Sequence, residues 1–291
     1  MQVSFIAIVT VAGVALAFSG LDVLRKVLGS HVRPLPLLVL LTAGSLPLWL
    51  VLAIREGDWN LGAGYLAPAL ASIALNVVAN LAFLQAVRVS PLSLTIPYLS
   101  LTPVFTTLLA VPILGERPAI LQVAGILLVV GGAFWLNVPA TGDATLSRIG
   151  RAVLDEPGSL LMILTAFCWS LAGPMDKLAV QASSWPVHAL VLSVGIAMAC
   201  VVVLAGRGEL GELRAGRWGL VGAAVLLTAV GMGLNLIALT LVWVGFIETF
   251  KRALGSVLAL VWGRIIFSEA ILATQVVAVL LMAAGVALIL W

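Results

Sequence analysis

The sequence predicts an all-α integral membrane protein with ten transmembrane helices, arranged as two inverted five-helix repeats. Three observations support this prediction: the mean hydropathy is +1.22, only 9% of the residues are charged, and apolar stretches recur along the chain. Each stretch is about 20 residues long, which as a helix spans a hydrocarbon core roughly 30 Å thick. The alternation of apolar and polar residues that membrane β-barrels need is absent, so we expect helices.

Ten apolar segments divide the chain into two sets of five. In the first set the predicted helices are Val3–Val27, Leu35–Ile54, Leu66–Val87, Leu92–Leu114 and Ala119–Val138. In the second set they are Ser159–Val180, Val187–Ala205, Leu220–Val242, Phe246–Phe267 and Ile271–Trp291. The first segment has no basic residues before its apolar run and no cleavage site of small residues before Asp22, so we expect a helix and not a signal peptide.

Two of these segments contain prolines that permit bending near candidate site residues. The fourth segment contains Pro97 and Pro103, close to Tyr98, and the sixth contains Pro174. A proline inside a helix leaves a backbone carbonyl of the preceding turn unpaired. We therefore expect these two helices to be bent or hinged.

The two sets of segments resemble each other in the order of their polar residues. The matching pairs are Ser19 with Ser170, Lys26 with Lys177, Asn80 with Asn235, Glu116 with Glu269, and Gln122 with Gln275. We therefore predict a first repeat at 1–138, a polar linker at 139–158 and a second repeat at 159–291. Because five spans is an odd number, the second repeat enters the membrane from the opposite side. Secondary transporters commonly have this architecture, with the substrate site between the repeats near the middle of the membrane.

Arginines are unevenly distributed between the two sets of loops. The loops after odd-numbered segments carry Arg33, Arg88, Arg148, Arg151, Arg207, Arg214, Arg217 and Arg264, whereas the other loops carry Arg55 and Arg117. Cytoplasmic loops are enriched in basic residues. We therefore expect both termini outside the cytoplasm and the linker inside, in the plasma (inner) membrane of a bacterium.

Charged residues inside the apolar segments form groups with a common pattern. They are Asp22, Arg25 and Lys26 in the first segment, Asp176 and Lys177 in the sixth, and Glu248, Lys251 and Arg252 in the ninth. In the first and ninth segments the acidic residue precedes the cations by three and four residues, so all three share one helix face and one cation is left over. A charge at depth costs at least ~2.5 kcal/mol and usually marks a pathway or a pair. We expect a basic cavity between the repeats.

Missing motifs exclude or disfavour other classes of function. His31 and His188 lie near segment ends, no residues have metal-ligand spacing, and GxSxG is absent, so we expect no enzyme, metal or cofactor. Cys168 and Cys200 are expected to be small buried residues. The absence of GxxxxGK[ST] argues against an ATP-driven pump. The net charge of +3 comes mostly from loop arginines and implies no nucleic-acid partner.

The stretch SLTPVFTTLLAVPILGERPAILQVAGILLVVGG, from Ser100, is similar to the most recognisable segment of the drug/metabolite transporter superfamily. Together with the two five-segment halves, it resembles the ten-helix EamA-type members over nearly the whole chain. That resemblance implies a transporter. The substrates of such transporters include amino acids, choline, drugs, sugar phosphates and nucleotide sugars.

A narrower resemblance concerns the plastid-type phosphate translocators of the same superfamily. ETFKRALGSVLALVWGRIIFSE resembles their ninth helix, which places Lys251 and Arg252 on the Lys-Arg pair that binds phosphate. VLRKVLGSHVRPLP and GPMDKLAV resemble their first and sixth helices, which places Lys26 and Lys177 on further basic positions. The tyrosine of their eighth helix has no match in this chain.

Two transport functions fit these residues. In the first, a secondary transporter or exchanger carries a small organic anion, such as a phosphorylated or carboxylated metabolite, by alternating access. In the second, an exporter carries zwitterionic amino acids or related metabolites, with proton coupling as an option. Either protein would work in the lipid bilayer as a monomer or a homodimer.

The expected roles of the residues follow from these two functions. For an anion, Lys251 and Arg252 bind the phosphate or carboxylate and Lys26 and Lys177 assist. For a zwitterion, the same cations take the carboxylate. The remaining roles are shaping of the site by Asn80, Asn235 and Tyr98, and charge pairing, amine binding or coupling by Asp22, Arg25, Asp176 and Glu248.

Counting along the segments places Lys26 and Lys251 at different depths. Lys26 is near the end of its segment and Lys251 near the start of another that crosses in the same direction. A single clamp of four cations therefore needs a long or tilted first helix. In the alternative, Lys26 serves one half of the pathway and Lys177, with Lys251 and Arg252, serves the other, as gates.

Overall fold

The computed structural model describes residues 3–90, 98–137, 157–213, 216–267 and 273–290. Within these ranges the chain forms ten α-helices and one short 3-10 helix, and it contains no strand. The first half comprises α1 (Phe5–Gly29), α2 (Pro34–Glu56), α3 (Leu66–Val89), α5 (Thr102–Leu114) and α6 (Ile120–Asn137). The second half comprises α8 (Pro157–Gln181), α9 (Trp185–Gly206), the 3-10 helix η1 (Leu210–Glu212), α10 (Trp218–Leu241), α11 (Val244–Phe267) and α12 (Ala273–Leu290).

The helices have the composition of membrane spans, which confirms the predicted fold class. By length and composition, α1, α2, α3, α8, α9 and α10 can each cross a membrane. Shorter apolar stretches occur in α5, α6 and α12. The apolar sequence of the continuous helix α11 is interrupted by Glu248, Lys251 and Arg252.

One predicted helix is interrupted in the structure. Residues 91–97 of the segment expected from Leu92, which include Pro97, lie outside the described residues; Tyr98 and Leu99 are helical, Ser100 and Leu101 form a turn, and α5 begins at Thr102. Pro103 therefore lies in the first turn of α5 and does not bend a longer helix, because a first-turn N–H has no helical partner to lose. Pro174 lies inside α8, as predicted.

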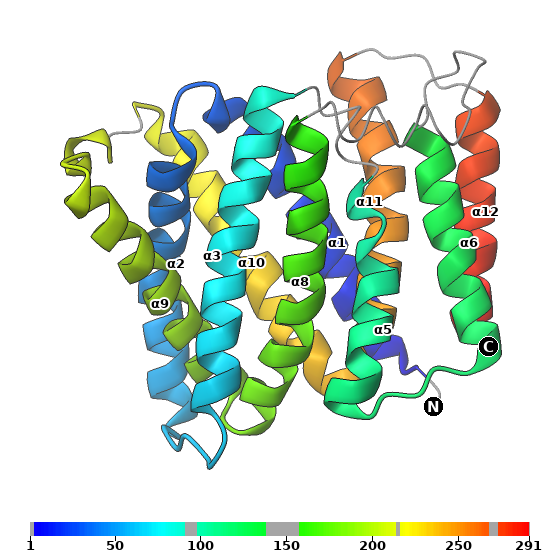
Figure 1. Cartoon of the computed structure of the whole chain (residues 1–291), viewed down its shortest axis with the longest axis horizontal. Helices are drawn as coiled ribbons and strands as arrows, with labels where there is room; N and C mark the ends of the chain where they lie inside the picture. Colours follow the sequence, from blue (N-terminus) through cyan, green and yellow to red (C-terminus); the bar gives the residue numbers. More distant parts are fainter. Residues whose placement is uncertain (1–2, 91–97, 138–156, 214–215, 268–272, 291) are drawn as a thin grey trace.

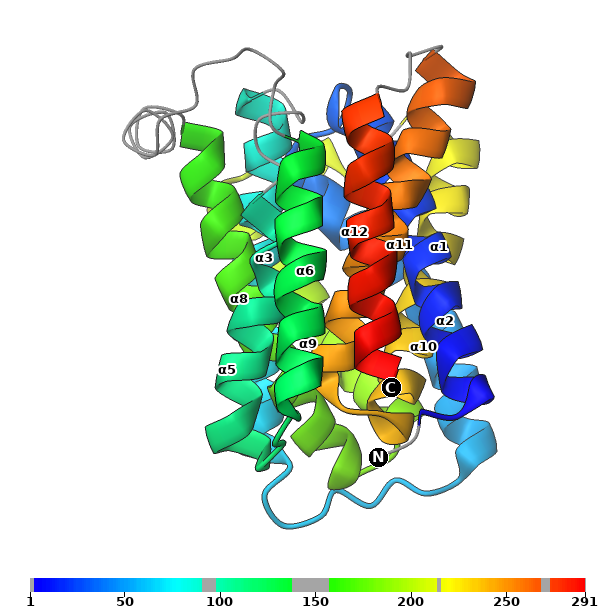
Figure 2. The ribbon, with the colours of Figure 1, turned by 90° about the vertical axis from the view of Figure 1, so that its right-hand side faces the viewer.

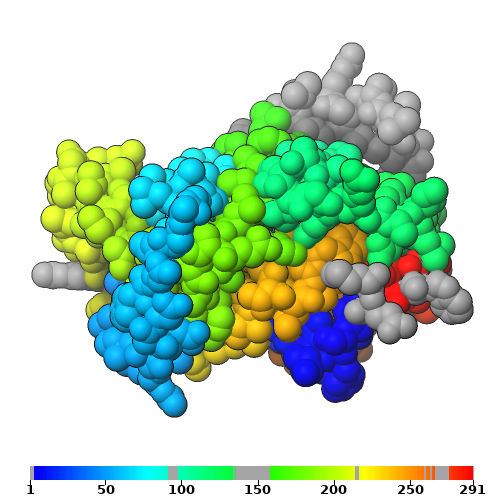
Figure 3. All heavy atoms as spheres, turned by 90° about the horizontal axis from the view of Figure 1, so that it is seen from below, coloured from blue at the N-terminus to red at the C-terminus, as the bar shows by residue number. Residues whose placement is uncertain are grey.

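Successive helices run in alternate directions, and both termini lie at the same end of the bundle (Figure 1). We call this the terminal end. The opposite end, where α1 finishes, α2 begins and α9 finishes, is the arginine-rich end, because Arg33, Arg88 and Arg207 lie there. Seen from the terminal end, atoms of the α5–α6 connection, of α8 and of the start of α11 lie close together (Figure 3).

The helix pairings have the symmetry of an inverted repeat. The pairs α6 with α12, α2 with α9 and α5 with α11 each join equivalent helices of the two halves, and α6 and α12 lie side by side in Figure 2. Every other major pair has a counterpart when the halves are exchanged. The α3–α8 contact matches α1–α10, α5–α8 matches α1–α11, and α2–α10 matches α3–α9.

Small residues allow the closest of these pairings. A Cβ atom on Gly125 of α6 would lie 2.5 Å from the backbone oxygen of Gly285 in α12, and one on Gly285 would lie 2.6 Å from that of Gly125. The two backbones therefore touch at this point. Close backbone approach through small residues is a common way to pack helices in lipid, where apolar burial gives little driving force.

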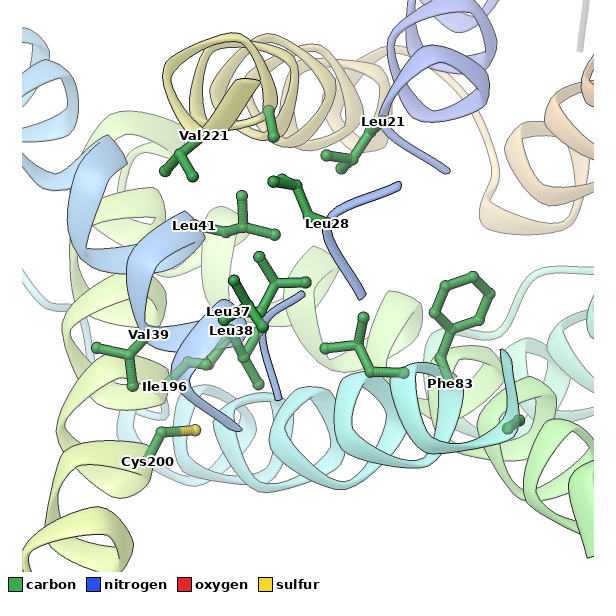
Figure 4. Packing of buried hydrophobic residues seen from close by; sticks show 14 of the residues in the cluster. Leu21, Leu28, Leu37, Leu38, Val39, Leu41, Phe83, Ile196, Cys200 and Val221 are labelled. Carbon is green, nitrogen blue, oxygen red and sulfur yellow. The ribbon is translucent and has the colours of Figure 1, made fainter. Parts of the chain in front are cut away.

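The largest buried cluster joins α1, α2, α3, α9 and α10 (Figure 4). Leu28, Leu37 and Leu41 lie at its centre, and Cys200 packs at its edge. Cys168 is also buried, so both cysteines have the predicted environment.

Candidate functional site

The charged residues of α1 and α11 lie together between these two packed helices. Asp22 of α1 interacts electrostatically with Lys251 and Arg252 of α11 as well as with Arg25. Arg252 in turn interacts with Glu248. We call these five residues the central charge cluster. Its three cations and two carboxylates leave a formal charge of +1.

Ion pairs within the central charge cluster hold two of its three cations. Lys251 pairs with Glu248 one helical turn before it, and its Nζ also lies 5.8 Å from the centre of the Phe18 ring. The Nη1 atom of Arg25 is 3.5 Å from the Asp22 carboxylate. In the described part of the chain, no carboxylate oxygen lies within ion-pair distance of Arg252. Arg252 is therefore the cation left over.

Several buried polar atoms of the central charge cluster lack a hydrogen-bond partner among the described residues. They are Nε of Arg25, Nε of Arg252 and Oε2 of Glu248. Outside the cluster, on α10, Oδ1 of Asn235 is also buried without a hydrogen-bond partner among the described residues. A buried polar group without a partner costs about 1–3 kcal/mol. Such groups are rare in folded proteins, and each calls for an explanation.

Arg25 connects the central charge cluster to α3. Its Nη2 atom donates to Oδ1 of Asn80 at 3.3 Å, and its guanidinium lies 5.6 Å from the centre of the Phe83 ring. Asn80 also donates to the carbonyl of Asn76, 2.8 Å away. Asn80 of α3 therefore faces α1 and holds Arg25 in place.

Lys177 lies in a second group, at the terminal end. Its Nζ is 2.7 Å from Oε1 of Glu116 and donates to the carbonyl of Val242 at 2.9 Å. Glu116 also accepts the backbone N–H of Val244, at 3.0 and 3.2 Å from its two oxygens. We call Lys177, Glu116, Val242 and Val244 the terminal clasp. It joins α8 to the α5–α6 and α10–α11 connections.

The four cations expected at the substrate site do not form one group in the structure. Lys251 and Arg252 lie in the central charge cluster, Lys177 lies in the terminal clasp, and Lys26 is exposed near the arginine-rich end of α1. Tyr98 is partly buried against the core cluster. Asn235 lies on α10, which packs against α1.

Glu116 and His188 make buried or partly buried polar contacts but were not among the candidate site residues selected from the sequence. Glu116 appeared only as a partner in the repeat, although its match to Glu269 parallels the match of Lys177 to Lys26 and could have indicated an ion pair. His188 lies near a helix start, yet it is fully buried and contacts Asp176, 3.1 Å away. Its sequence context gave no sign of that contact.

A separate recess lies at the arginine-rich end, between α2, α3 and α9. It encloses about 290 Å³, and its charged lining residues are Arg33, Arg88, Arg207 and Glu209. Arg33 pairs with Glu209 at 3.3 Å and with Glu212 at 2.9 Å. No residue of the central charge cluster lines this recess, so the two basic regions are distinct.

Comparison with known proteins identifies one family. The model of the EamA-like transporter family matches residues 5–138 and 156–291, that is, each half separately. A solved structure titled only as the crystal structure of a protein is similar, with a TM-score of 0.77 and 18% identity over 97% of this chain and 95% of that chain. At this identity the likeness concerns the fold. A comparison with curated proteins found no match.

Proposed function

The chain belongs to the EamA-like transporter family, and on this premise we propose that it is a secondary active transporter of small organic anions that carry a phosphate or carboxylate group. The central charge cluster supports this substrate class. Its formal charge is +1, and its left-over cation is an arginine, whose planar guanidinium suits bidentate binding of an oxyanion.

The single observation that carries the proposal is that the Arg252 guanidinium lacks partners for its buried donor in the described part of the chain. Its Nε–H is buried, and neither a hydrogen-bond acceptor nor a carboxylate of the described residues is paired with it. An oxyanion bound beside Arg252 would pair this donor and neutralise the surplus charge. Nε of Arg25 offers a second donor of the same kind.

The proposal is tested by a thermal-stability panel on the detergent-purified protein. The probes are inorganic phosphate, 3-phosphoglycerate, citrate, glutamate, leucine and choline. A ligand at about 100 times its Kd adds about 2.7 kcal/mol to the free energy of unfolding. We expect the phosphorylated or carboxylated anions to stabilise the wild-type protein, and Arg252→Gln to lose that stabilisation.

The exposed Arg207 provides a matched control, because it lies outside the central charge cluster. Arg207→Gln removes one positive charge and is expected to keep the full response to anions. Equal loss in both variants would mean that overall charge, and not this site, binds the anions. Stabilisation by choline alone would overturn the proposed substrate class.

A second candidate function rests on Asp22. Its side chain is 49% exposed, and its ion-pair partner Arg25 is 3.5 Å away. A carboxylate so accessible, beside cations, could bind the amine of a zwitterionic amino acid whose carboxylate contacts Arg252. Stabilisation by glutamate or leucine that disappears in Asp22→Asn would favour this exporter over the anion transporter.

The terminal clasp supports transport by alternating access. It joins α8 to the α5–α6 and α10–α11 connections at the terminal end, so breaking it would allow these parts of the bundle to separate there. The repeat relates Lys177 to Lys26 and Glu116 to Glu269, which lies outside the described residues.

A further inference from the structure

Four side chains from three helices form a buried hydrogen-bonded group near the terminal end, which we call the His188 group. Nε2 of His188 is 3.1 Å from Oδ1 of Asp176, and the hydroxyl of Tyr65 is 3.1 Å from Nδ1 of His188. Ser72 also donates to Asp176. All four residues are buried, and His188 is completely inaccessible to solvent. The proposed anion site uses neither His188 nor Tyr65.

Few other ionisable groups come near the His188 group in the described part of the chain. Helices α5 and α10 contain none, and those of α2, Arg55 and Glu56, are exposed in its last turn. On α3 the charged residue is Arg88, at the opposite end of the bundle. On α8, Lys177 is paired with Glu116. Helices α11 and α1, which contact α8 and α3, carry the residues of the central charge cluster, which pair mainly with one another. The local charge therefore depends on the His188 group itself.

The geometry of the His188 group accommodates two protonation states. A neutral imidazole donates from Nε2 to Asp176 and accepts at Nδ1 from the Tyr65 hydroxyl, whereas an imidazolium donates from both nitrogens. Burial, with the nearby Asp176 charge, raises the pKa of Tyr65 to about 12, so its hydroxyl keeps its proton and can donate. Both nitrogens of His188 are thus paired in either state.

The two states differ in net charge. With a neutral imidazole, the buried pair carries the single negative charge of Asp176, which is costly in a low-dielectric interior. With an imidazolium, the pair is neutral overall, and the attraction between its two charges is strong because water is excluded. Closure around the group therefore favours the state with the proton bound.

We propose that Asp176 and His188 form a proton-binding site, and that a proton bound there favours the closed arrangement of the terminal end. This inference rests on the proposed function and deepens it, because it names the proton as the ion linked to transport. Asp176 precedes Lys177 of the terminal clasp on α8. A movement of α8 that opens the clasp would therefore also disturb the contacts of Asp176.

A line of hydrogen bonds along α3 connects the His188 group to the central charge cluster. Asn76 donates to Ser72 at 3.1 Å, Asn80 donates to the carbonyl of Asn76 at 2.8 Å, and Arg25 donates to Asn80 at 3.3 Å. The proton-binding site and the proposed anion site thus contact the same face of one helix. Occupancy of one site can influence the other through the position of α3.

Histidine NMR tests the proton-binding site without any substrate. The chain has two histidines, His31 and His188, so ring signals of isotope-labelled histidine can be assigned with His188→Gln. Spectra recorded between about pH 5 and pH 9 are expected to show proton binding at the His188 ring. The Asp176→Asn variant removes the negative partner and should shift that proton binding to lower pH. A His188 ring that stays in one state throughout this range would overturn the proposal.

Distance measurements test the link to closure. Spin labels at Asn60→Cys and Ile120→Cys, in a Cys168→Ala/Cys200→Ala background, report on two exposed positions at the terminal end. We expect a second, open distance population to grow as the pH rises. A tenfold difference in proton affinity between the two arrangements would change the open-to-closed ratio by up to about tenfold.

Two variants decide whether His188 causes this response. His188→Gln keeps an amide that can donate to Asp176 but binds no proton, so it should abolish the pH response, whereas His31→Gln should retain it. A full response in His188→Gln would overturn the proposal. If anions stabilise the protein but the pH response of the distance survives in His188→Gln, the proton-binding site is wrong and the proposed substrate class stands. If the pH response requires His188 but no anion stabilises the protein, the substrate class is wrong and the proton-binding site stands.

Discussion

Lys251 and Arg252 are adjacent in sequence but have different surroundings. Lys251 is paired with Glu248 and lies over the Phe18 ring, so its charge is largely used within the protein. Arg252 has no such pair among the described residues. Successive helical residues point about 100° apart, which is why one sequence pair can contain a positioned cation and an available one.

This difference predicts how variants of the Lys251–Glu248 ion pair affect anion binding. Lys251→Met leaves Glu248 unpaired and changes the formal charge of the central charge cluster from +1 to 0, so anion-dependent stabilisation should be lost. Glu248→Gln combined with Lys251→Met restores +1 and should recover part of it in the same thermal panel. If the double variant is no better than Lys251→Met, then Lys251 contacts the anion itself.

Removing the exposed carboxylate of Asp22 is predicted to strengthen anion binding. Asp22→Asn raises the formal charge of the central charge cluster from +1 to +2, so the Kd for a bound organic anion should fall by about threefold to tenfold, limited by solvent screening at this half-exposed residue. Titration with the anion that stabilises the wild type measures this. Weaker anion binding in Asp22→Asn would show that Asp22 serves to position Arg25.

At the scale of helices, the terminal clasp predicts a stability cost. The side chains of Lys177 and Glu116 are only 15% and 13% exposed, so Glu116→Gln leaves a nearly buried ammonium without its carboxylate. We expect a loss of about 2–4 kcal/mol in unfolding free energy and a larger open population at the terminal end. Thermal unfolding and the Asn60–Ile120 distance measure these effects.

An exposed ion pair provides the control for the clasp. Arg33 pairs with Glu209 and Glu212, but its side chain is 56% exposed, so Arg33→Gln should cost at most about 1 kcal/mol and leave the terminal end unchanged. A Glu116→Gln/Lys177→Met variant should be more stable than Glu116→Gln alone. Equal effects of Glu116→Gln and Arg33→Gln would contradict the clasp.

The close backbone contact between α6 and α12 predicts a second variant that lowers the free energy of unfolding. Gly125→Val places a side chain where the Gly285 carbonyl oxygen already lies, 2.5 Å from the new Cβ, so the helices must separate. We expect a loss of about 1–3 kcal/mol, measured by thermal unfolding. Gly131→Ala, on the same helix with nothing within 4 Å, should be neutral or stabilising.

Much of the helix layout could be predicted because it depends on local sequence. The span Val187–Ala205 was predicted where α9 covers Trp185–Gly206, since length and apolar composition define a span. The five charges that meet between α1 and α11 were selected because helical spacing placed each set on one face. The contacts of His188 could not be predicted, because they join residues far apart in the chain through tertiary packing; for Glu116 the repeat offered the one signal, its match to Glu269 beside that of Lys177 to Lys26.

At the scale of the whole molecule, the inverted repeat relates the two ends of the bundle, but arginines are unequally distributed between them. The described loops and helix ends of the arginine-rich end carry Arg33, Arg88, Arg207 and Arg217, and those of the terminal end carry Arg55 and Arg117. The recess between α2, α3 and α9 concentrates three of these cations at one end. By the positive-inside rule, we predict that the arginine-rich end faces the cytoplasm.

This orientation is tested by labelling single cysteines in intact cells, in a Cys168→Ala/Cys200→Ala background. Asn60→Cys lies in the α2–α3 connection at the terminal end, and Arg207→Cys lies at the end of α9; both positions are exposed. A membrane-impermeant maleimide should modify Asn60→Cys from outside and Arg207→Cys only after permeabilisation. The reversed pattern would place both termini in the cytoplasm, and the terminal clasp would then close the cytoplasmic side of the pathway. Protons bound at the His188 group would in that case come from the cytoplasm, so this experiment also determines which pH controls closure.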